Sequence, residues 1–418
     1  MPSSPSRLSS SSSILDELEG PEPKHSVLSI ILNVFLCLIL FTIMVLPLMV
    51  YYIQSRSLKL LKANRKPSRS AVLLCISAHW IVFLLAIPLK FFYYSLEPTK
   101  FSLFAIIVSD FAFLLIVVTF IATISVQLIF FVLRVSKIYE FEQNCEAFEY
   151  AFSMGLSFLL TIIAIVVAFS IQTTTYSINI PGVDSFSIGL ATDLHVNGAH
   201  HGNNFIDRIA ERCVSAEIDA LFLVGDVIDV PKPLKTLALT STSFAALRSI
   251  TPLGTFAVSG NHDVMSGEAE FEDIMEQGGI TVLSDEIVEL SDGVVVIGLR
   301  DYGRKSDNVA IKVTNLVNKA LDFSPTMIIV MIHQPYNQLM EAMASYETSV
   351  PIVILSGHTH KGQIIGATFF VPLFYKYYYG QYCLSDKVSL IVSSGIGTWA
   401  PMGRLGTRSE LVVVTVNS

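Results

Sequence analysis

The sequence is poor in charged residues, and acidic residues outnumber basic ones. Asp, Glu, Lys and Arg make up 15% of the 418 residues, whereas 52% are hydrophobic, which is too apolar for a protein that is soluble throughout. Part of the chain is therefore expected to lie in lipid. The formal net charge of −8 and the lack of a dense basic stripe argue against nucleic acid as a partner, because binding a phosphate backbone requires many Lys and Arg residues.

Cysteine is also scarce. The five cysteines show no C-x-x-C spacing, so they predict neither a zinc knuckle nor a disulfide framework. We expect them to act as small buried hydrophobic residues, although Cys213 and Cys383 could pair if their domain faces an oxidising compartment. The polar half of the chain also lacks an N-x-S/T sequon, which a eukaryotic domain on the lumenal side often carries.

Long apolar runs dominate the first 172 residues. Residues 1–26 are rich in serine without an apolar period and are expected to form a disordered tail. They do not resemble a cleaved signal peptide, because the apolar run that follows is far longer than a signal sequence needs. Four runs each reach the roughly 20 residues that cross hydrocarbon, and they predict transmembrane helices at about 27–53, 71–95, 101–135 and 150–172. The overlong third run is expected to form one tilted or protruding helix.

The distribution of cations predicts how these four helices cross the membrane. The loop between the first two runs holds six Lys and Arg residues, whereas the tail holds only Arg7 and Lys24. By the positive-inside rule the loop is cytoplasmic, and the C-terminal domain lies on the exoplasmic side; the missing sequon argues the other way. His79, Lys90 and Asp110 lie in or near the runs. A transport pathway is one interpretation of such charges, but Lys90 and Asp110 are close enough to the run ends to reach an interface.

The remaining sequence has the pattern of an α/β domain. Residues 173–184 are expected to be a polar linker, and the domain is expected to occupy residues 185–418. Short β-branched runs alternate there with helical and turn segments. They predict a helix at 203–216 and strands at 186–191, 220–224, 255–258, 294–298, 327–332, 352–355, 389–392 and 411–416.

Five clusters of Asp, His and Asn follow directly on five of these strands. In an α/β fold, side chains just past the carboxyl ends of adjacent strands converge on one crevice. Carboxylates, imidazoles and amide oxygens are ligands of divalent metals, and a pair of ions needs a carboxylate to share. The clusters therefore predict a two-metal site. They are ATDLHVN with Asp193 and His195, GDVID with Asp226 and Asp229, GNHD with Asn261, His262 and Asp263, IHQP with His333, and GHTH with His358 and His360.

The ordered set D-x-H, G-D-x-x-D, G-N-H-D, H and G-H-x-H resembles the calcineurin-like metallophosphoesterase superfamily over about residues 186–418. The later segments GHTHKGQI, YKYYYGQY and SSGIGTWAPMGRLGTRSE resemble a multi-span membrane-anchored subgroup related to UDP-2,3-diacylglucosamine hydrolases. The resemblance implies a sandwich of two mixed sheets flanked by helices. It also implies two divalent metal ions, with Mn, Fe and Zn left open. Asp193, His195 and His360 would bind the first ion, Asn261, His333 and His358 the second, and Asp226 both.

The resemblance also implies a mechanism. A hydroxide bridging the ions would attack phosphorus, and His262 would stabilise or protonate the leaving oxygen while Asp229 orients its imidazole. A purely structural role is the alternative for His262, and helix capping is favoured for Asp263. Protein phosphatases of the superfamily carry an Arg where this chain has Val230. Because valine cannot bind a phosphate dianion through two hydrogen bonds, we expect a phosphodiester or pyrophosphate substrate. A lipid-linked substrate is one candidate. A phosphomonoesterase, a non-catalytic metal-binding scaffold and a membrane receptor or transporter are the alternatives.

Several further residues are left with two interpretations. The aromatic segment 367–382 predicts a core strand and turn, or else an apolar lip that touches a bilayer or an acyl chain. Four cations are candidate phosphate contacts but are more typical of a solvated surface: Arg300, Lys361, Arg404 and Arg408. His200 and His201 are expected to be ordinary loop residues rather than parts of the site.

Overall fold

The computed structural model describes residues 100–136, 145–199, 201–229, 241–302 and 308–418. These residues form two compact units. One is a helical unit of residues 100–167 together with 400–405, and the other is an α/β unit of residues 168–399 and 406–418. The predicted apolar helices at 27–53 and 71–95, the tail before them, and His79 and Lys90 lie outside the described residues.

Two long apolar helices make up most of the helical unit. The third apolar run forms one continuous helix, α4 (Lys100–Val135), as predicted, and the fourth forms α5 (Cys145–Phe169). Both are long and apolar enough to cross a membrane, with mean hydropathies of 2.7 and 2.5. The hydroxyls of Thr119 and Ser157 join the two helices at 2.6 Å. Asp110 is buried in the helical unit.

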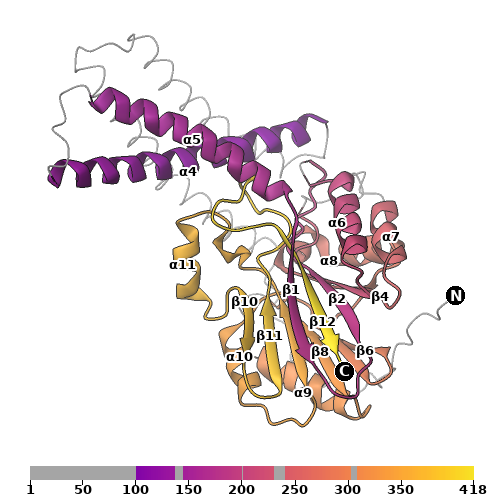
Figure 1. Ribbon diagram of the computed structural model, residues 1–418. Coiled ribbons are helices and arrows are strands. Elements are labelled where there is room, and N and C mark those ends of the chain that lie inside the picture. The colour runs from indigo at the N-terminus through magenta and orange to yellow at the C-terminus, as the bar shows by residue number, and fades with distance from the viewer. Residues whose placement is uncertain (1–99, 137–144, 200, 230–240, 303–307) are drawn as a thin grey trace. The chain divides into compact units, whose positions relative to one another are not determined.

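The α/β unit contains two six-stranded mixed sheets (Figure 1). One sheet has the order β1 (Gln172–Asn179), β12 (Glu410–Asn417), β2 (Phe186–Ala191), β3 (Ala220–Val224), β4 (Gly254–Val258) and β5 (Thr281–Val282). The other has the order β10 (Gly380–Cys383), β11 (Val388–Val392), β9 (Ile352–Ser356), β8 (Met327–Met331), β7 (Val294–Gly298) and β6 (Glu286–Ser291). Strands β2, β3 and β4 are parallel to one another, as are β7, β8 and β9.

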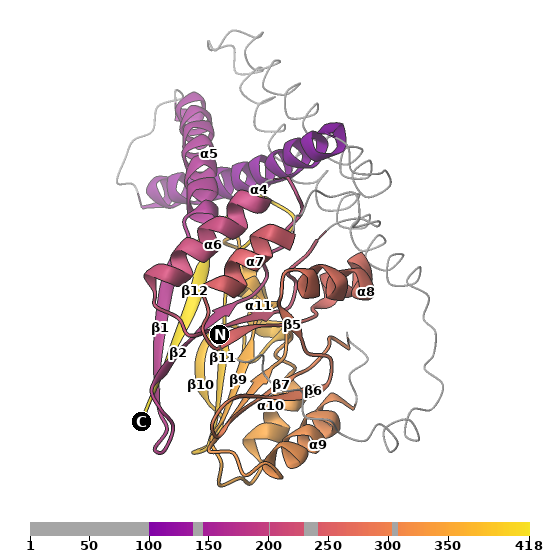
Figure 2. The ribbon, with the colours of Figure 1, turned by 90° about the vertical axis from the view of Figure 1, so that its right-hand side faces the viewer.

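The core lies between the sheets. Alternate residues of the central strands, such as Phe222 on β3 and Ile329 on β8, pack into one buried cluster. The opposite faces are covered by helices (Figure 2): α6 (Asn203–Ser215), α7 (Ser241–Ser249) and α8 (Asn261–Gln277) on the first sheet, and α9 (Val309–Leu321) and α10 (Asn337–Ala344) on the second. Because the central strands are buried on both faces, they read as continuous apolar runs, and the predicted sandwich of two mixed sheets flanked by helices is confirmed.

Two expectations for the α/β unit are wrong. The segment predicted as a linker forms β1, whose eight residues pair in parallel with β12, from Gln172 beside Glu410 to Asn179 beside Asn417. Its Thr and Tyr residues suit a strand, but its partner is more than 200 positions away and one face is exposed, so no apolar run marks it. Cys213 is buried in α6, as expected, but Cys383 is exposed on β10, so the expectation of a buried residue is wrong for it. The two cysteines are free, and the disulfide that the sequence left open does not form.

Candidate metal centre

The Asp and His clusters lie where five central strands end. Asp193 and His195 follow β2, Asp226 follows β3, and His358 and His360 follow β9. All five residues have a left-handed backbone, with φ between 46° and 70°. Asp tolerates this conformation better than most residues, as His does, but each instance still costs energy that the surrounding structure must offset. Such turns direct the side chains to one point instead of continuing the strands.

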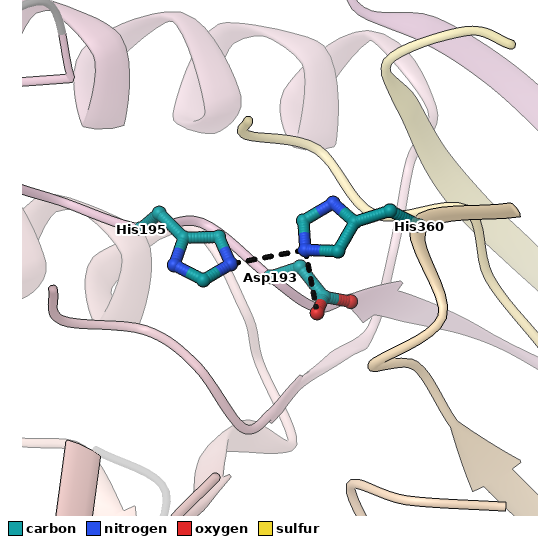
Figure 3. A group of neighbouring side chains, drawn as sticks. All are labelled: Asp193, His195 and His360. Atoms are coloured by element: carbon teal, nitrogen blue, oxygen red, sulfur yellow. Dashed lines mark hydrogen bonds and ion pairs between the residues drawn. The ribbon is translucent and has the colours of Figure 1, made fainter. Parts of the chain in front are cut away.

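A first group of side chains contains Asp193, His195 and His360, which point toward one another (Figure 3). Nε2 of His195 lies 3.0 Å from Nε2 of His360, which in turn lies 3.3 Å from Oδ1 of Asp193. All three residues are buried. The Asp193 carboxylate also accepts hydrogen bonds from the Thr192 hydroxyl and the backbone N–H of His358, so its orientation is fixed.

A second group contains Asp226, His333 and His358, and a further set that shares members with both groups contains His195, Asp226 and His262. Nε2 of His333 lies 3.1 Å from Oδ2 of Asp226 and 3.2 Å from Nδ1 of His358. Nδ1 of His333 lies 2.9 Å from the carbonyl of Val224; a carbonyl can only accept, so this nitrogen carries a proton. Metal-ligating histidines commonly make such a bond with the nitrogen that faces away from the ion.

The carboxylate of Asp226 lies between the two groups. Its Oδ2 is 3.9 Å from Nε2 of His195 in the first group and 3.1 Å from Nε2 of His333 in the second. Its Oδ1 accepts a hydrogen bond of 2.8 Å from the backbone N–H of His262. This is the placement that a carboxylate shared by two cations requires.

Asn261 provides a separate test of whether the residues suit a cation. It is the first residue of α8, directly after β4, and its Oδ1 is buried with no hydrogen-bond partner in the described part of the chain. The preceding turn is close to Asp226, because a Cβ on Gly260 would lie 2.3 Å from the Asp226 backbone nitrogen. A buried carbonyl without a partner is costly. Together with the converging imidazole nitrogens, it fits a pair of divalent ions.

The pKa values of the buried groups show how strongly they interact. Burial alone would lower the pKa of His333, but Asp226 outweighs it and raises that pKa to about 10. Burial and the neighbouring His333 lower the pKa of His358 to about 3. Burial alone would raise the pKa of Asp226, but His333 and His262 hold it well below its usual range. The Asp226 carboxylate is thus stabilised by neighbouring positive charge, which a bound cation would also supply, whereas burial raises the pKa of the Asp193 carboxyl.

His262 and Asp229 form a pair beside these groups. Nδ1 of His262 lies 3.0 Å from Oδ1 of Asp229, and the His262 ring stands edge-on to that of His195 with centroids 4.8 Å apart. Burial alone would lower the pKa of His262, but Asp229 and Asp226 raise it to about 9. His262 is therefore suited to holding a proton that it can donate. Asp229 also approaches Nδ1 of His195 at 3.4 Å, a contact that the sequence did not predict.

Asp263 has a structural role. Its carboxylate accepts hydrogen bonds from the backbone N–H groups of Gly260, Val227 and Ile228. The first bond caps the start of α8, and the other two hold the loop after β3, which carries Asp226. The structure thus favours the capping interpretation, although Asp263 occupies the third position of the helix and not the cap itself.

The sequence did not predict that Trp399 and Gln363 belong to this region. The Trp399 ring stands at 66° to the His262 ring with centroids 5.9 Å apart. Gln363 holds the Trp399 backbone in two places, because its Oε1 accepts from the Trp399 N–H at 2.9 Å and its Nε2 donates to the Trp399 carbonyl at 3.1 Å. No motif signalled this contact, since the two residues lie 36 positions apart.

The remaining predicted residues have other surroundings. Arg404 is fully buried, so the solvated-surface interpretation is wrong for it. Arg408 lies 3.7 Å from Glu410 and Lys361 lies over the Tyr379 ring. His201 is buried and stacks on Phe205, whereas His200 and Val230 lie outside the described residues.

In segment 367–382 the core-strand interpretation is wrong for the first half, which forms an exposed helix, α11 (Ala367–Phe374).

The Asp and His side chains that could hold metal ions lie in a segment that matches a known family. Residues 186–371 match the calcineurin-like phosphoesterase superfamily domain. The chain carries a calcineurin-like metallophosphoesterase domain. The match contains all the clusters that follow the central strands, from Asp193 to His360.

Relatives of the metallophosphoesterase domain occur in bacteria and animals. An uncharacterized metallophosphoesterase of Helicobacter pylori is 31% identical over 224 residues, which cover 53% of this chain and 57% of that protein. A protein of Danio rerio named transmembrane protein with metallophosphoesterase domain is 24% identical over 54% of this chain and 52% of its own length. The matches thus span little more than half of these relatives. A dimetal phosphatase structure from Danio rerio covers 50% of this chain and 86% of its own, with 10% identity and a TM-score of 0.33, which is too low to support an argument.

Proposed function

We propose that this protein is a membrane-anchored hydrolase that cleaves a phosphodiester or pyrophosphate bond with the help of two divalent metal ions. The observation that carries the proposal is the position of Asp226, whose carboxylate approaches imidazoles of both cation-binding groups. A phosphomonoesterase is the alternative for the same site. A non-catalytic scaffold would be expected to lack part of the ligand set, whereas this set is complete in the sequence.

We assign the ligands according to the two groups. Asp193, His195 and His360 would hold one ion, Asn261, His333 and His358 would hold the other, and Asp226 would contribute to both sites. When bound, such ions lower the pKa of a water molecule and neutralise charge on phosphoryl oxygens. The donor set of carboxylate, imidazole and amide oxygen suits Mn, Fe or Zn.

The chain itself supplies the proton for the leaving group. His262 carries a raised pKa and its Nδ1 faces Asp229, so Asp229 fixes the ring and His262 donates from Nε2 to the leaving oxygen. The Trp399 ring lies next to the His262 ring, with centroids 5.9 Å apart. The missing Arg after GDVID, where Val230 stands, favours a substrate whose phosphorus carries two organic or phosphoryl substituents.

The membrane half supports anchoring. Helices α4 and α5 are long and apolar enough to span a bilayer, and relatives in two animals are named as transmembrane proteins. We extend this to four spans, with the metallophosphoesterase domain on the exoplasmic side, from the apolar runs and the cations of the first loop. A substrate in or near the bilayer, such as a lipid-linked diester or pyrophosphate, is consistent with such an anchor.

The proposal is tested with the full-length protein in detergent, stripped of metal and reloaded with Mn²⁺, Fe²⁺ or Zn²⁺. Hydrolysis of bis(p-nitrophenyl) phosphate is compared with that of p-nitrophenyl phosphate and of a lipid pyrophosphate. We expect metal-dependent hydrolysis that favours the diester or the pyrophosphate and is lost in Asp226→Asn. Asp273→Asn, an equivalent change at an exposed position of α8, is the matched control. Turnover that survives chelation contradicts the proposal, and preference for the monoester supports the alternative.

A further inference from the structure

Helix α11 exposes almost all of its apolar surface. Its sequence is ATFFVPLF, and none of its residues is buried. Phe369, Phe370, Leu373 and Phe374 are exposed to 74%, 62%, 74% and 72%. Elsewhere in the described α/β unit, exposed large apolar side chains such as Val214, Ile311 and Phe323 lie on separate elements. A cluster of four within eight residues is a different kind of surface, because large exposed apolar patches commonly mark interaction sites.

This surface is unfavourable in water. Burying one Phe or Leu side chain contributes about 1.5–3 kcal/mol, so leaving four of them in water forgoes a large stabilisation. A helix of eight residues is also too short to be stable from its own backbone hydrogen bonds, and α11 contains Pro372. The apolar face therefore requires a partner that covers it.

The chemistry of α11 and its flanks matches a lipid bilayer. Lys361 precedes the helix and Lys376 follows it, with Tyr375 and Tyr377 on either side of Lys376. Phe and Leu that enter the acyl boundary, with Lys and Tyr at the level of the head groups, are typical of helices that lie in a membrane interface. Lys376 is exposed, and its ammonium group lies 3.6 Å from the carboxylate of Glu341, which is exposed as well. Such a surface ion pair is worth little, so anionic head groups can replace Glu341 as its partner.

The chain itself also favours a bilayer over another partner. Helix α5 has the length and hydropathy of a membrane span, ends at Phe169, and is followed by β1 from Gln172. The α/β unit is thus connected to that helix by two residues. If α5 spans the membrane, this short connection keeps the α/β unit next to the bilayer and raises the effective concentration of lipid around it.

Helix α11 is also connected closely to the metal centre. The Tyr375 ring, directly after the helix, stands edge-on to the His358 ring with centroids 5.5 Å apart. The Thr359 hydroxyl donates to the Tyr378 carbonyl at 2.6 Å. Gly362, with φ 81°, approaches the first turn so closely that a Cβ there would lie 2.5 Å from the Thr368 nitrogen. The GHTHKG loop and α11 are therefore held together at both ends of the helix.

We propose that α11 is an interfacial helix that inserts its phenylalanines and Leu373 into the surface of the bilayer in which the chain is anchored. The insertion fixes the GHTHKG loop at the membrane. With the proposed function, on which this last step rests, it brings the metal centre to the level of lipid head groups, where a phosphoester or pyrophosphate carried by a lipid would enter the site.

The test uses full-length protein reconstituted into phosphatidylcholine and phosphatidylglycerol vesicles. An environment-sensitive NBD label is attached at Phe370→Cys or, separately, Phe374→Cys, in a background where Cys213 is replaced by alanine and the other native cysteines by serine. Ile311→Cys on α9, also exposed, is the matched control. Thermal unfolding of each labelled protein verifies the fold. Emission is measured with nitroxide-labelled phospholipid and, separately, with aqueous iodide.

We expect the α11 labels to lose most of their emission with the nitroxide lipid and to resist iodide, and the Ile311 label to show the reverse. Quenching of the α11 labels by iodide to the same extent as the control would place the helix in water and overturn the proposal. Protection from both quenchers would mean that protein covers the helix, and this result would also overturn the proposal. Quenching does not depend on turnover, so it can be interpreted even if the hydrolysis assay fails. Hydrolysis without quenching by the nitroxide lipid would support the proposed function and contradict the insertion of α11.

Discussion

The carboxylate of Asp229 contacts two imidazoles at once: Oδ1 lies 3.0 Å from Nδ1 of His262, and Oδ2 lies 3.4 Å from Nδ1 of His195. One carboxylate thus orients both the proposed proton donor and a proposed metal ligand. The two histidines therefore should respond differently when each is changed, whereas a change at Asp229 should affect both roles.

His262→Gln is expected to lower kcat by about 10²- to 10⁴-fold, the range of a general acid, while the bound metal is retained. Removing the imidazole takes away the proton for the leaving oxygen and leaves the assigned ligands in place. Steady-state kinetics on the diester, with metal content measured on the same sample, checks this. Loss of metal together with activity would instead make His262 a ligand.

Asp229→Asn is expected to weaken metal affinity or activity by about 10- to 100-fold, as is usual when the partner of a ligating histidine is removed. An amide keeps the size of the side chain but removes the negative charge that faces both imidazoles. Metal titration and kinetics distinguish the two effects. If affinity for metal is unchanged, the contact with His195 has no role in holding the ion.

Gln363→Ala is expected to release Trp399 from its position against His262. Its effect on kcat/KM should match that of Trp399→Ala, and the double variant should be no worse than either single one, because the two residues then act as a unit. Gln363→Glu, which retains the acceptor for the Trp399 N–H, should lose less than the alanine variant. Additive losses in the double variant would show that Gln363 acts independently of Trp399.

Asp263→Ala is expected to lower the temperature of unfolding. The folded fraction of this variant should still bind metal. The change leaves three buried backbone N–H groups without an acceptor, and each buried donor left unsatisfied costs about 1–3 kcal/mol. Differential scanning fluorimetry, with Asp273→Asn as the control for losing a carboxylate on α8, measures this shift. An unchanged unfolding temperature would contradict the capping role.

The cysteines of the metallophosphoesterase domain are expected to react at very different rates. Burial raises the pKa of the Cys213 thiol to about 12, so almost no thiolate forms near neutral pH, and the side chain is also inaccessible. Cys383 is exposed. Iodoacetamide followed by peptide mass spectrometry should find Cys383 modified in the native protein and Cys213 modified only after unfolding. A Cys213–Cys383 disulfide in the same spectra would contradict the structure.

The sequence predicted the buried parts of the fold better than the exposed ones. Strands such as β3 and β9 are apolar on both faces, so their runs mark them clearly. β1 and β10 are half exposed, and β1 is a strand only because β12 offers it an edge. Helix α11 was predicted as core because its residues are apolar, and periodicity alone does not distinguish a buried run from one that faces a membrane.

The sequence also predicted some residues of the candidate site and not others. The structure brings together the motif residues that follow the strands, such as Asp193, Asp226 and His333, because the strand ends meet at one place. Trp399 and Gln363 were missed, since their contact depends on loops that the folded chain brings together. The role of Asp263 was open in the sequence, because an Asp in the first turn of a helix suits both capping and metal binding.

Metal stoichiometry tests the central claim most directly. Full-length protein, purified and loaded with Mn²⁺ or Zn²⁺ and freed of unbound metal, is analysed by inductively coupled plasma mass spectrometry beside Asn261→Ala, Asp226→Asn and the control Asp273→Asn. The account predicts about two ions per chain in the wild type and the control, as a site with a shared carboxylate holds, close to one in Asn261→Ala, and the lowest content in Asp226→Asn. A wild type that holds a single ion, or an Asp226→Asn variant that keeps its full content, would contradict it.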